Sequence, residues 1–268
     1  MSLIVTKELA QTIELSEIDA LHSRLMAMQA IEGNPMGVDI QQFGNATAFS
    51  VKNIPGPSFN TVKGLTDGDE QFMDQLIEFY TEKEIRVRFE LTPAHASPDL
   101  LAHLQQAGFY HSDFHTSLYG SLIQSAVTVD ERITIRRLES HEFDLFAEIY
   151  AKGFQMPTFL QSGIAQNNVI LHGNDHWTFY LASLDDEPAG IGVLFVKDGM
   201  ATLAAAATVP HLRSKGVQQA LIHQRIQHAT RLHSRLIVGQ AEFGSVSQNN
   251  MERAGMKIAY TKAIWVQQ

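Results

Sequence analysis

Hydrophobic side chains recur along the chain with two different periods, and the period indicates which element each segment forms. Within residues 1–32, apolar residues from Ile18 to Met28 recur at three- and four-residue spacing behind Ser16, a residue type that often caps helices. This spacing predicts an amphipathic helix over the second part of that segment. Gly33 is expected to end it.

The rest of the first half alternates between strand-like and helix-like segments. A Pro-Gly-Pro turn separates two stretches rich in β-branched and aromatic residues, so these are predicted to be neighbouring strands. A helix is expected from Thr66 or Asp67, and the strict alternation that follows it is typical of a half-buried strand. The predicted elements after the first helix are strands over 46–54 and 58–65, a helix within 66–84, a strand over 85–93, and a helix and a strand within 97–120.

From Ala126 the pattern begins again. Three apolar stretches joined by short polar turns predict an antiparallel meander, and helical periods lie before and after it. The predicted order is a strand over 129–138, a helix over 140–154 capped by Ser140, a loop-rich segment over 154–175, strands over 177–184, 189–197 and 201–209, a helix after 216, a strand over 235–241, a helix over 245–255 and a strand over 257–266.

Two segments resemble each other and suggest an internal repeat. Residues 100–119 and 246–265 each contain a helix that ends in Ala-Gly, followed by a strand that ends on an aromatic residue. We therefore predict an α+β fold with two related domains, residues 1–122 and 123–268. Each domain is expected to contain a mostly antiparallel sheet flanked by helices.

Composition and charge narrow the function classes. The 268 residues are 44% hydrophobic, enough to bury a core, and contain no cysteine, which excludes disulfides, a thiolate nucleophile and cysteine-ligated metal centres. The formal net charge of −9 disfavours a nucleic-acid partner and suits a cationic substrate such as an amine. The start of the chain lacks the apolar run of a secretory signal, and no stretch is long enough to span a membrane, so a cytoplasmic protein without a membrane partner is expected.

The junction after the third meander strand carries the most specific chemical signal. Pro210 ends the strand at Val209, and Arg213, Lys215 and Gly216 precede the next helix. A glycine lets the backbone approach a ligand closely, and a helix start presents unpaired amide groups with a partial positive charge. A phosphate or diphosphate is the anion that such a junction is suited to bind.

Residues 126–268 resemble the GNAT N-acetyltransferase superfamily at this junction. In that family an Arg/Gln-x-x-Gly-x-Gly/Ala loop binds the diphosphate of coenzyme A, and the strand before the loop splays away from its neighbour to admit the acyl-pantetheine arm. Arg213 and Gly216 match the first two motif positions, while Gln218 replaces the last Gly or Ala. Asn250, on the later helix, is placed by this resemblance to contact the pantetheine arm. The resemblance implies acetyl-CoA as co-substrate, bound by Ala207, Thr208, Val209, Arg213, Ser214, Lys215, Gly216, Val217, Gln218 and Asn250.

Acetyl transfer to an amine requires a polarised thioester carbonyl, a base for the ammonium and a group that stabilises the leaving thiolate. The backbone amide of Thr208 or Val209 is expected to polarise the carbonyl. Glu242 and His211 are the candidate bases, acting directly or through water. Many family members carry a tyrosine acid where this chain has Met251, so either Tyr260 or a water is the acid, or the helix start only stabilises the leaving thiolate.

The first half carries no comparable loop. At the corresponding place, between the strand over 58–65 and its helix, lie Asp67, Asp69 and Glu70, whose charge would repel a phosphate. The N-terminal domain is therefore predicted to be a degenerate copy that has lost cofactor binding.

The histidines do not predict a metal site. His111 and His115 lie on one face of a predicted strand, but about 13 Å apart, too far to share an ion. His172 and His176 share a loop with Asp175, but no further ligand is evident.

The sequence therefore predicts an acetyl-CoA-dependent N-acetyltransferase that acts on a primary amine of a small molecule or peptide by direct attack in a ternary complex. The loop-rich segment 154–175, with Phe159 and Trp177, is expected to form part of the acceptor wall, and the N-terminal domain is expected to shape that pocket or a homodimer. Two alternatives stay open: a non-catalytic protein that binds coenzyme A or acyl-CoA, and a transferase with a larger acyl or aminoacyl donor.

Overall fold

A computed structural model describes residues 4–54, 56–122 and 130–267 and divides into two compact units. Unit 1 comprises Met1–Ser117, Ala241–Phe243 and Ile258–Gln268, and unit 2 comprises Leu118–Gln240 and Gly244–Lys257. These units differ from the predicted ranges 1–122 and 123–268 chiefly because the C-terminal strand packs with the N-terminal half.

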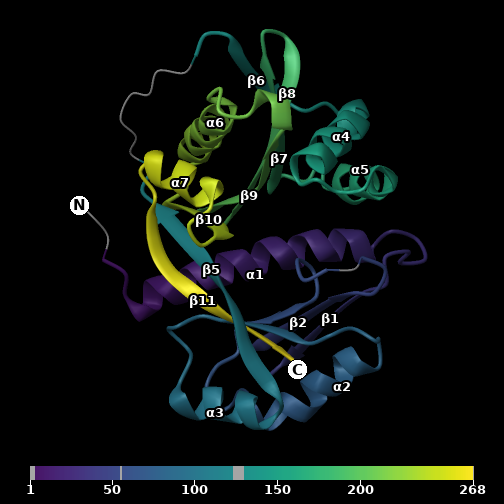
Figure 1. Ribbon diagram of the computed structural model, residues 1–268, viewed down its shortest axis with the longest axis vertical. Coiled ribbons are helices and arrows are strands. Elements are labelled where there is room, and N and C mark those ends of the chain that lie inside the picture. Colours follow the sequence, from purple (N-terminus) through teal and green to yellow (C-terminus); the bar gives the residue numbers. More distant parts are fainter. Residues whose placement is uncertain (1–3, 55, 123–129, 268) are drawn as a thin grey trace. The chain divides into compact units, whose positions relative to one another are not determined.

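Unit 1 is built on a sheet whose strand order is β1-β2-β3-β4-β11-β5 (Figure 1). Neighbouring pairs β1–β2, β2–β3 and β4–β11 are antiparallel, while β3 and β4 are parallel. The C-terminal strand β11 thus lies between two strands of the N-terminal half. The elements are α1 (Lys7–Gln29), β1 (Val38–Phe43), β2 (Ala46–Val51), β3 (Thr61–Lys63), the 3-10 helix η1 (Asp69–Phe72), α2 (Met73–Thr81), β4 (Arg88–Leu91), α3 (Pro98–Gln106), β5 (Phe109–Gly120) and β11 (Lys257–Gln267).

Two elements of unit 1 depart from the sequence prediction. Helix α1 begins at Lys7 rather than after Ser16, because the Thr6 side chain caps it by accepting a bond from the Leu9 amide at 3.2 Å. Ser16 lies inside the helix, where its hydroxyl donates to the Ile13 carbonyl at 2.7 Å. Strand β1 was not predicted, because its polar residues hide the alternation of a half-buried strand.

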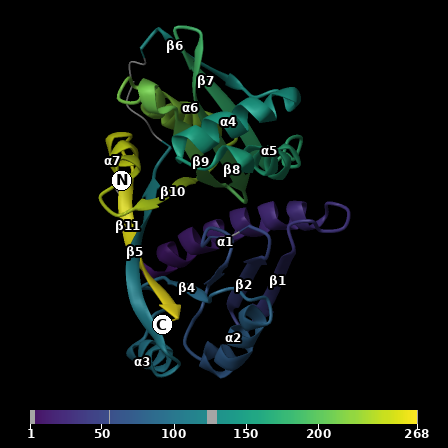
Figure 2. The same cartoon turned by 45° about the vertical axis from the view of Figure 1, so that its right-hand side comes forward.

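The two faces of the unit 1 sheet differ in polarity. One face packs its apolar residues, among them Val62 and Phe89, against α2 and α3. The residues that alternate with these, including Lys63 and Glu90, face helix α1, which lies on the opposite side of the sheet (Figure 2). This face is held by a buried ion network: Lys262 Nζ lies 2.7 Å from Glu17 and 2.8 Å from Glu90, and Lys63 pairs with Glu90.

Unit 2 contains the strand order β10-β9-β8-β7-β6, antiparallel except for the β9–β10 pair. Helices α4 and α6 both contact β8 and β9, one on each face of the sheet (Figure 1). The elements are β6 (Ile133–Arg137), η2 (Ser140–Glu142), α4 (Phe143–Gly153), η3 (Thr158–Leu160), α5 (Gln161–Val169), β7 (Trp177–Leu184), β8 (Glu187–Lys197), β9 (Met200–Thr208), η4 (Pro210–Leu212), α6 (Val217–Arg231), β10 (Leu236–Glu242) and α7 (Val246–Arg253).

The predicted element order of the second half and the α+β class are confirmed. The predicted cap at Ser140 is wrong, because Glu139 is the N-cap of η2, which leads into α4. Glu139 and Glu142 form a capping box in which each side chain accepts a bond from the other's backbone.

Candidate functional site

Strands β9 and β10 separate part of the way along their length. Their parallel pairing runs from Met200 with Leu236 to Leu203 with Gly239, and β9 then continues through residues 204–208, of which 205–208 pair with β8. Residues 204–208 therefore present one backbone edge away from β8, where the parallel pairing has ended. We call this backbone edge the β9 edge.

The hydrogen bonds between β8 and β9 determine which amide groups of β9 point toward the β9 edge. The Val209 N–H donates to the Ala189 carbonyl at 2.9 Å, so Val209 faces β8. Successive residues of an antiparallel strand alternate in direction, which turns the N–H groups of Thr208 and Ala206 toward the β9 edge. The Val209 amide is thus not available to polarise a ligand carbonyl, whereas the Thr208 amide is. Ala206 is a second candidate that the sequence did not indicate.

An orphaned polar atom lies at the same edge. The Thr208 hydroxyl is buried and has no hydrogen-bond partner among the residues that the structure describes. A buried polar atom without a partner costs free energy.

The loop after β9 exposes the start of helix α6. Ser214 and Gly216 have positive φ angles of 61° and 85°. Gly216 is the N-cap residue of α6, and no side chain caps the helix there. Because the first amide groups of a helix lack partners within it, this loop presents several donors together with the positive end of the helix dipole. Lys215 is exposed beside them. The arrangement suits an anion such as a diphosphate.

Arg213, the first residue of the motif, contacts two other elements of unit 2. Its Nη2 donates to the Gly153 carbonyl and its Nε donates to the Thr208 carbonyl at 3.3 Å, so the guanidinium ties the end of α4 to the end of β9. Gly153 allows this close approach, since a Cβ there would come within 2.6 Å of the Ala207 Cβ. Arg213 holds the loop through these two bonds, and it remains exposed, so it is also able to face an anion.

Solved structures of GCN5-related N-acetyltransferases are similar to this chain over nearly its whole length. One from Kribbella flavida has a TM-score of 0.65 at 11% identity, covering 91% of this chain and 95% of that one. One from Sphaerobacter thermophilus has a TM-score of 0.62 at 16% identity, covering 92% and 91%. A tandem GNAT protein from the clavulanic acid biosynthesis pathway has a TM-score of 0.60 at 12% identity, covering 95% of each chain.

The chain has the tandem GNAT fold. Neither a protein-family model nor a curated protein sequence matches it.

In this GNAT fold, Asn250 lies on α7 and is fixed by helix α6. Gln219 Nε2 donates to the Asn250 carbonyl at 2.9 Å and to its side-chain oxygen at 3.1 Å, and Arg253 donates to that oxygen at 3.0 Å. The Asn250 amide nitrogen is the end of the side chain left for a ligand. Gln219 is a positioning residue that sequence reasoning missed, although its place in the first turn of α6 was readable. Gln218, at the last motif position, is half-buried beside it.

The candidate catalytic residues are divided between the two units. His211 lies in unit 2 and its Nε2 is 2.8 Å from Glu187, with both side chains exposed. Glu242 and Tyr260 belong to unit 1. Burial raises the pKa of Tyr260, whose ring lies near Glu17 and Lys262 of the ion network, so the phenol keeps its proton. Met251 is buried, and its sulfur lies so close to Gly239 that a Cβ there would come within 2.6 Å of it.

In unit 1 the loop equivalent to the phosphate loop is closed by its own carboxylates. Asp69 is buried and accepts bonds from the backbone amides of Thr66 at 2.9 Å and Asn45 at 3.0 Å. Glu70 accepts from the Gly68 amide at 2.6 Å, and Glu14 accepts from the Gly64 amide at 3.2 Å. The carboxylates therefore accept bonds from backbone donors that an anion would need, and the loss of cofactor binding by this half stays a prediction.

The segment after α4 exposes apolar side chains. Phe154 is 50% exposed, Met156 37% and Phe159 81%, and they follow directly on Gly153, which contacts the end of β9. Trp177 is buried, at 6% exposure, so it cannot line an acceptor wall as the sequence suggested. Phe154, Met156 and Phe159 are therefore exposed apolar side chains in the segment that follows Gly153.

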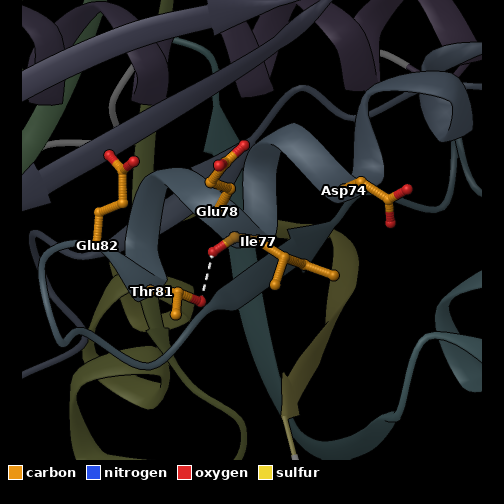
Figure 3. A pocket seen from close by; sticks show the side chains of 5 residues that line it. All are labelled: Asp74, Ile77, Glu78, Thr81 and Glu82. Carbon is orange, nitrogen blue, oxygen red and sulfur yellow. Dashed lines mark hydrogen bonds between the residues drawn. The ribbon is translucent and has the colours of Figure 1, made fainter.

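The described residues also contain a hollow that does not belong to this site. The hollow in Figure 3 follows helix α2 of unit 1 and is lined by Asp74, Ile77, Glu78, Thr81 and Glu82; it contains none of the predicted site residues. Within the described ranges, no group of three or more His, Asp or Glu side chains is placed to hold a metal ion. Nor is any helix in those ranges long and apolar enough to cross a membrane.

Proposed function

We propose that the protein is an acetyl-CoA-dependent N-acetyltransferase whose unit 2 binds the coenzyme and whose acceptor is a primary amine of a small molecule or peptide. One combination of features carries the proposal. Helix α6 begins after Gly216 without a side-chain cap, Ser214 and Gly216 both have positive φ angles, and the β9 edge precedes them in the chain. The orphaned Thr208 hydroxyl and the absence of a Cβ at Gly216 fit a coenzyme with a diphosphate and an amide-containing arm.

The residues of unit 2 would divide the work as follows. The amides of residues 214–218 and Lys215 hold the diphosphate, and Asn250 holds an amide of the arm. When bound, acetyl-CoA supplies an acyl group activated as a thioester. The amide of Thr208 or Ala206, the two that face the β9 edge, then polarises the acyl carbonyl. His211 takes the proton of the attacking ammonium, directly or through water, and a water provides a proton for the thiolate.

A second function, binding of coenzyme A or acyl-CoA without turnover, is favoured by one observation. Met251, which has no proton to give, fills its position completely, and the exposed His211 is the one candidate base within unit 2.

Two measurements on the full-length protein distinguish these functions. Calorimetry with coenzyme A should give one site per chain, because the loop of unit 1 is closed. Release of free thiol from acetyl-CoA should rise when members of a panel of primary amines are added. Binding without amine-dependent thiol release would support the non-catalytic function, and no binding would refute both.

A further inference from the structure

A buried arginine lies directly behind the β9 edge. Arg225, on α6, interrupts the apolar arc of that helix, yet it is only 1% exposed. Its guanidinium fits over Gly192, where a Cβ would come within 3.2 Å of Nε. Burial lowers the pKa of Arg225 to about 10, so the side chain stays charged at neutral pH. No carboxylate pairs with it among the residues that the structure describes.

Backbone carbonyls take the place of the missing carboxylate. Nε donates to the Leu221 carbonyl at 3.0 Å, and Nη1 donates to the carbonyls of Val193 at 3.3 Å and Ala205 at 3.1 Å. Val193 and Ala205 form the register pair next to a β-bulge, where the register passes to Leu194 with Leu203. A bulge disrupts the ladder locally, and the guanidinium bonds to both carbonyls of the pair at that place.

The bond to Ala205 has a consequence on the other side of the strand. In a trans peptide the carbonyl of one residue and the N–H of the next point in opposite directions. The Ala205 carbonyl faces β8 and Arg225, so the Ala206 N–H faces the β9 edge. A cation bound to the carbonyl polarises the whole peptide group, which strengthens its N–H as a donor by roughly 10–30%.

We propose that Arg225 is a positioning residue that fixes the β9 bulge and both aims and strengthens the Ala206 amide as a donor to the acyl carbonyl. This inference rests on the proposed function, because it assigns the acyl group to the β9 edge. Arg225 does not touch the ligand; it acts through the peptide group between Ala205 and Ala206.

The test compares the full-length wild type with Arg225→Met, and uses Arg231→Met, an exposed arginine on the same helix, as the matched control. Gly192→Ala is a second variant, which displaces the guanidinium by adding a methyl group 3.2 Å from Nε while keeping the charge. The readouts are calorimetry with coenzyme A, thiol release from acetyl-CoA, and the infrared stretch of the carbonyl in acetyl-CoA labelled with carbon-13.

In the wild type and in Arg231→Met, the bound carbonyl should absorb at a lower frequency than in free acetyl-CoA. In Arg225→Met, and partly in Gly192→Ala, the band should move back toward the free value and thiol release should fall by about tenfold. Affinity for coenzyme A, which lacks the acyl carbonyl, should change by less than about twofold.

A wild-type carbonyl band in a folded Arg225→Met would overturn the inference. If that variant fails to fold by circular dichroism, an unshifted band in Gly192→Ala overturns it instead. Failure of the wild type to bind coenzyme A would refute the proposed function itself, and the two failures are therefore distinguishable.

Discussion

Replacement of Gly216 by alanine tests the coenzyme loop at its most specific position. Gly216 has a φ of 85°, and its added Cβ would meet only Ile133 Cδ1, at an ordinary contact distance of 3.5 Å. The methyl group therefore fits sterically, and the cost is one of backbone conformation. A residue with a Cβ in the left-handed region costs roughly 1–2 kcal/mol.

The chain can relieve that strain only by rotating the peptide groups around residue 216. Such a rotation turns at least one amide away from the anion. The loss of one hydrogen bond to a charged group is worth about 1.5–3 kcal/mol, so the Kd for coenzyme A should rise by about 10- to 150-fold. Isothermal calorimetry on the full-length protein measures this directly.

Gly255 provides the matched control. It has a φ of 88°, nothing within 4 Å of its added Cβ, and a place after helix α7. Gly255→Ala should therefore lower the thermal midpoint about as much as Gly216→Ala, but leave the Kd for coenzyme A unchanged. Equal affinity of both variants and the wild type would refute the reasoning, because the loop would then not present its amides to the ligand.

Four further predictions concern other parts of the chain. Phe159→Ser should raise the KM for apolar amines about tenfold, in steady-state assays, and leave the Kd for coenzyme A unchanged; a change in that Kd would contradict the assignment to the acceptor side. Lys262→Met should lower the free energy of unfolding in urea by about 3–5 kcal/mol, because it leaves buried carboxylates without their cation; a loss below about 1 kcal/mol would count against the network. Burial alone would raise the pKa of Glu90, but Lys262 and Lys63 outweigh it and hold that pKa well below the ordinary 4.5. The free energy of unfolding in urea should therefore decrease as the pH falls below 4.5. A free energy of unfolding that does not change with acid pH would exclude this linkage. Asp69→Asn should lower the free energy of unfolding in urea by about 2 kcal/mol and leave coenzyme binding unchanged. A change in coenzyme binding would show that unit 1 takes part in that binding.

The fold was largely predictable because hydrophobic periods and turn residues are local signals. The meander, helix α6 and the glycine-containing loop before that helix all follow from short patterns within residues 177–231. The exchange of β11 into unit 1 was not predictable, because an alternating strand carries no mark of which sheet it joins. The start of α1 was missed because Ser16, which looks like a cap, bonds to its own helix.

The candidate site was predictable to a smaller extent. The glycine and the helix start were readable from spacing, but the tether formed by Arg213 depends on Gly153, sixty residues away in the chain. The Val209 amide was misassigned because the direction of a strand amide depends on the ladder and not on the residue. Arg225 broke the expected apolar arc, and its partners are main-chain atoms, which sequence patterns do not report.

Strand β11 imposes an order on biosynthesis. The ribosome completes residues 1–120 long before it delivers residues 257–267, yet the sheet of unit 1 needs that last strand between β4 and β5, with Lys262 balancing two carboxylates in its interior. Until residues 257–267 have been made, the sheet of the nascent N-terminal half lacks a strand, and Lys63 faces the carboxylates of Glu17 and Glu90 without Lys262. Removal of β11 would therefore open the sheet of unit 1 rather than that of unit 2.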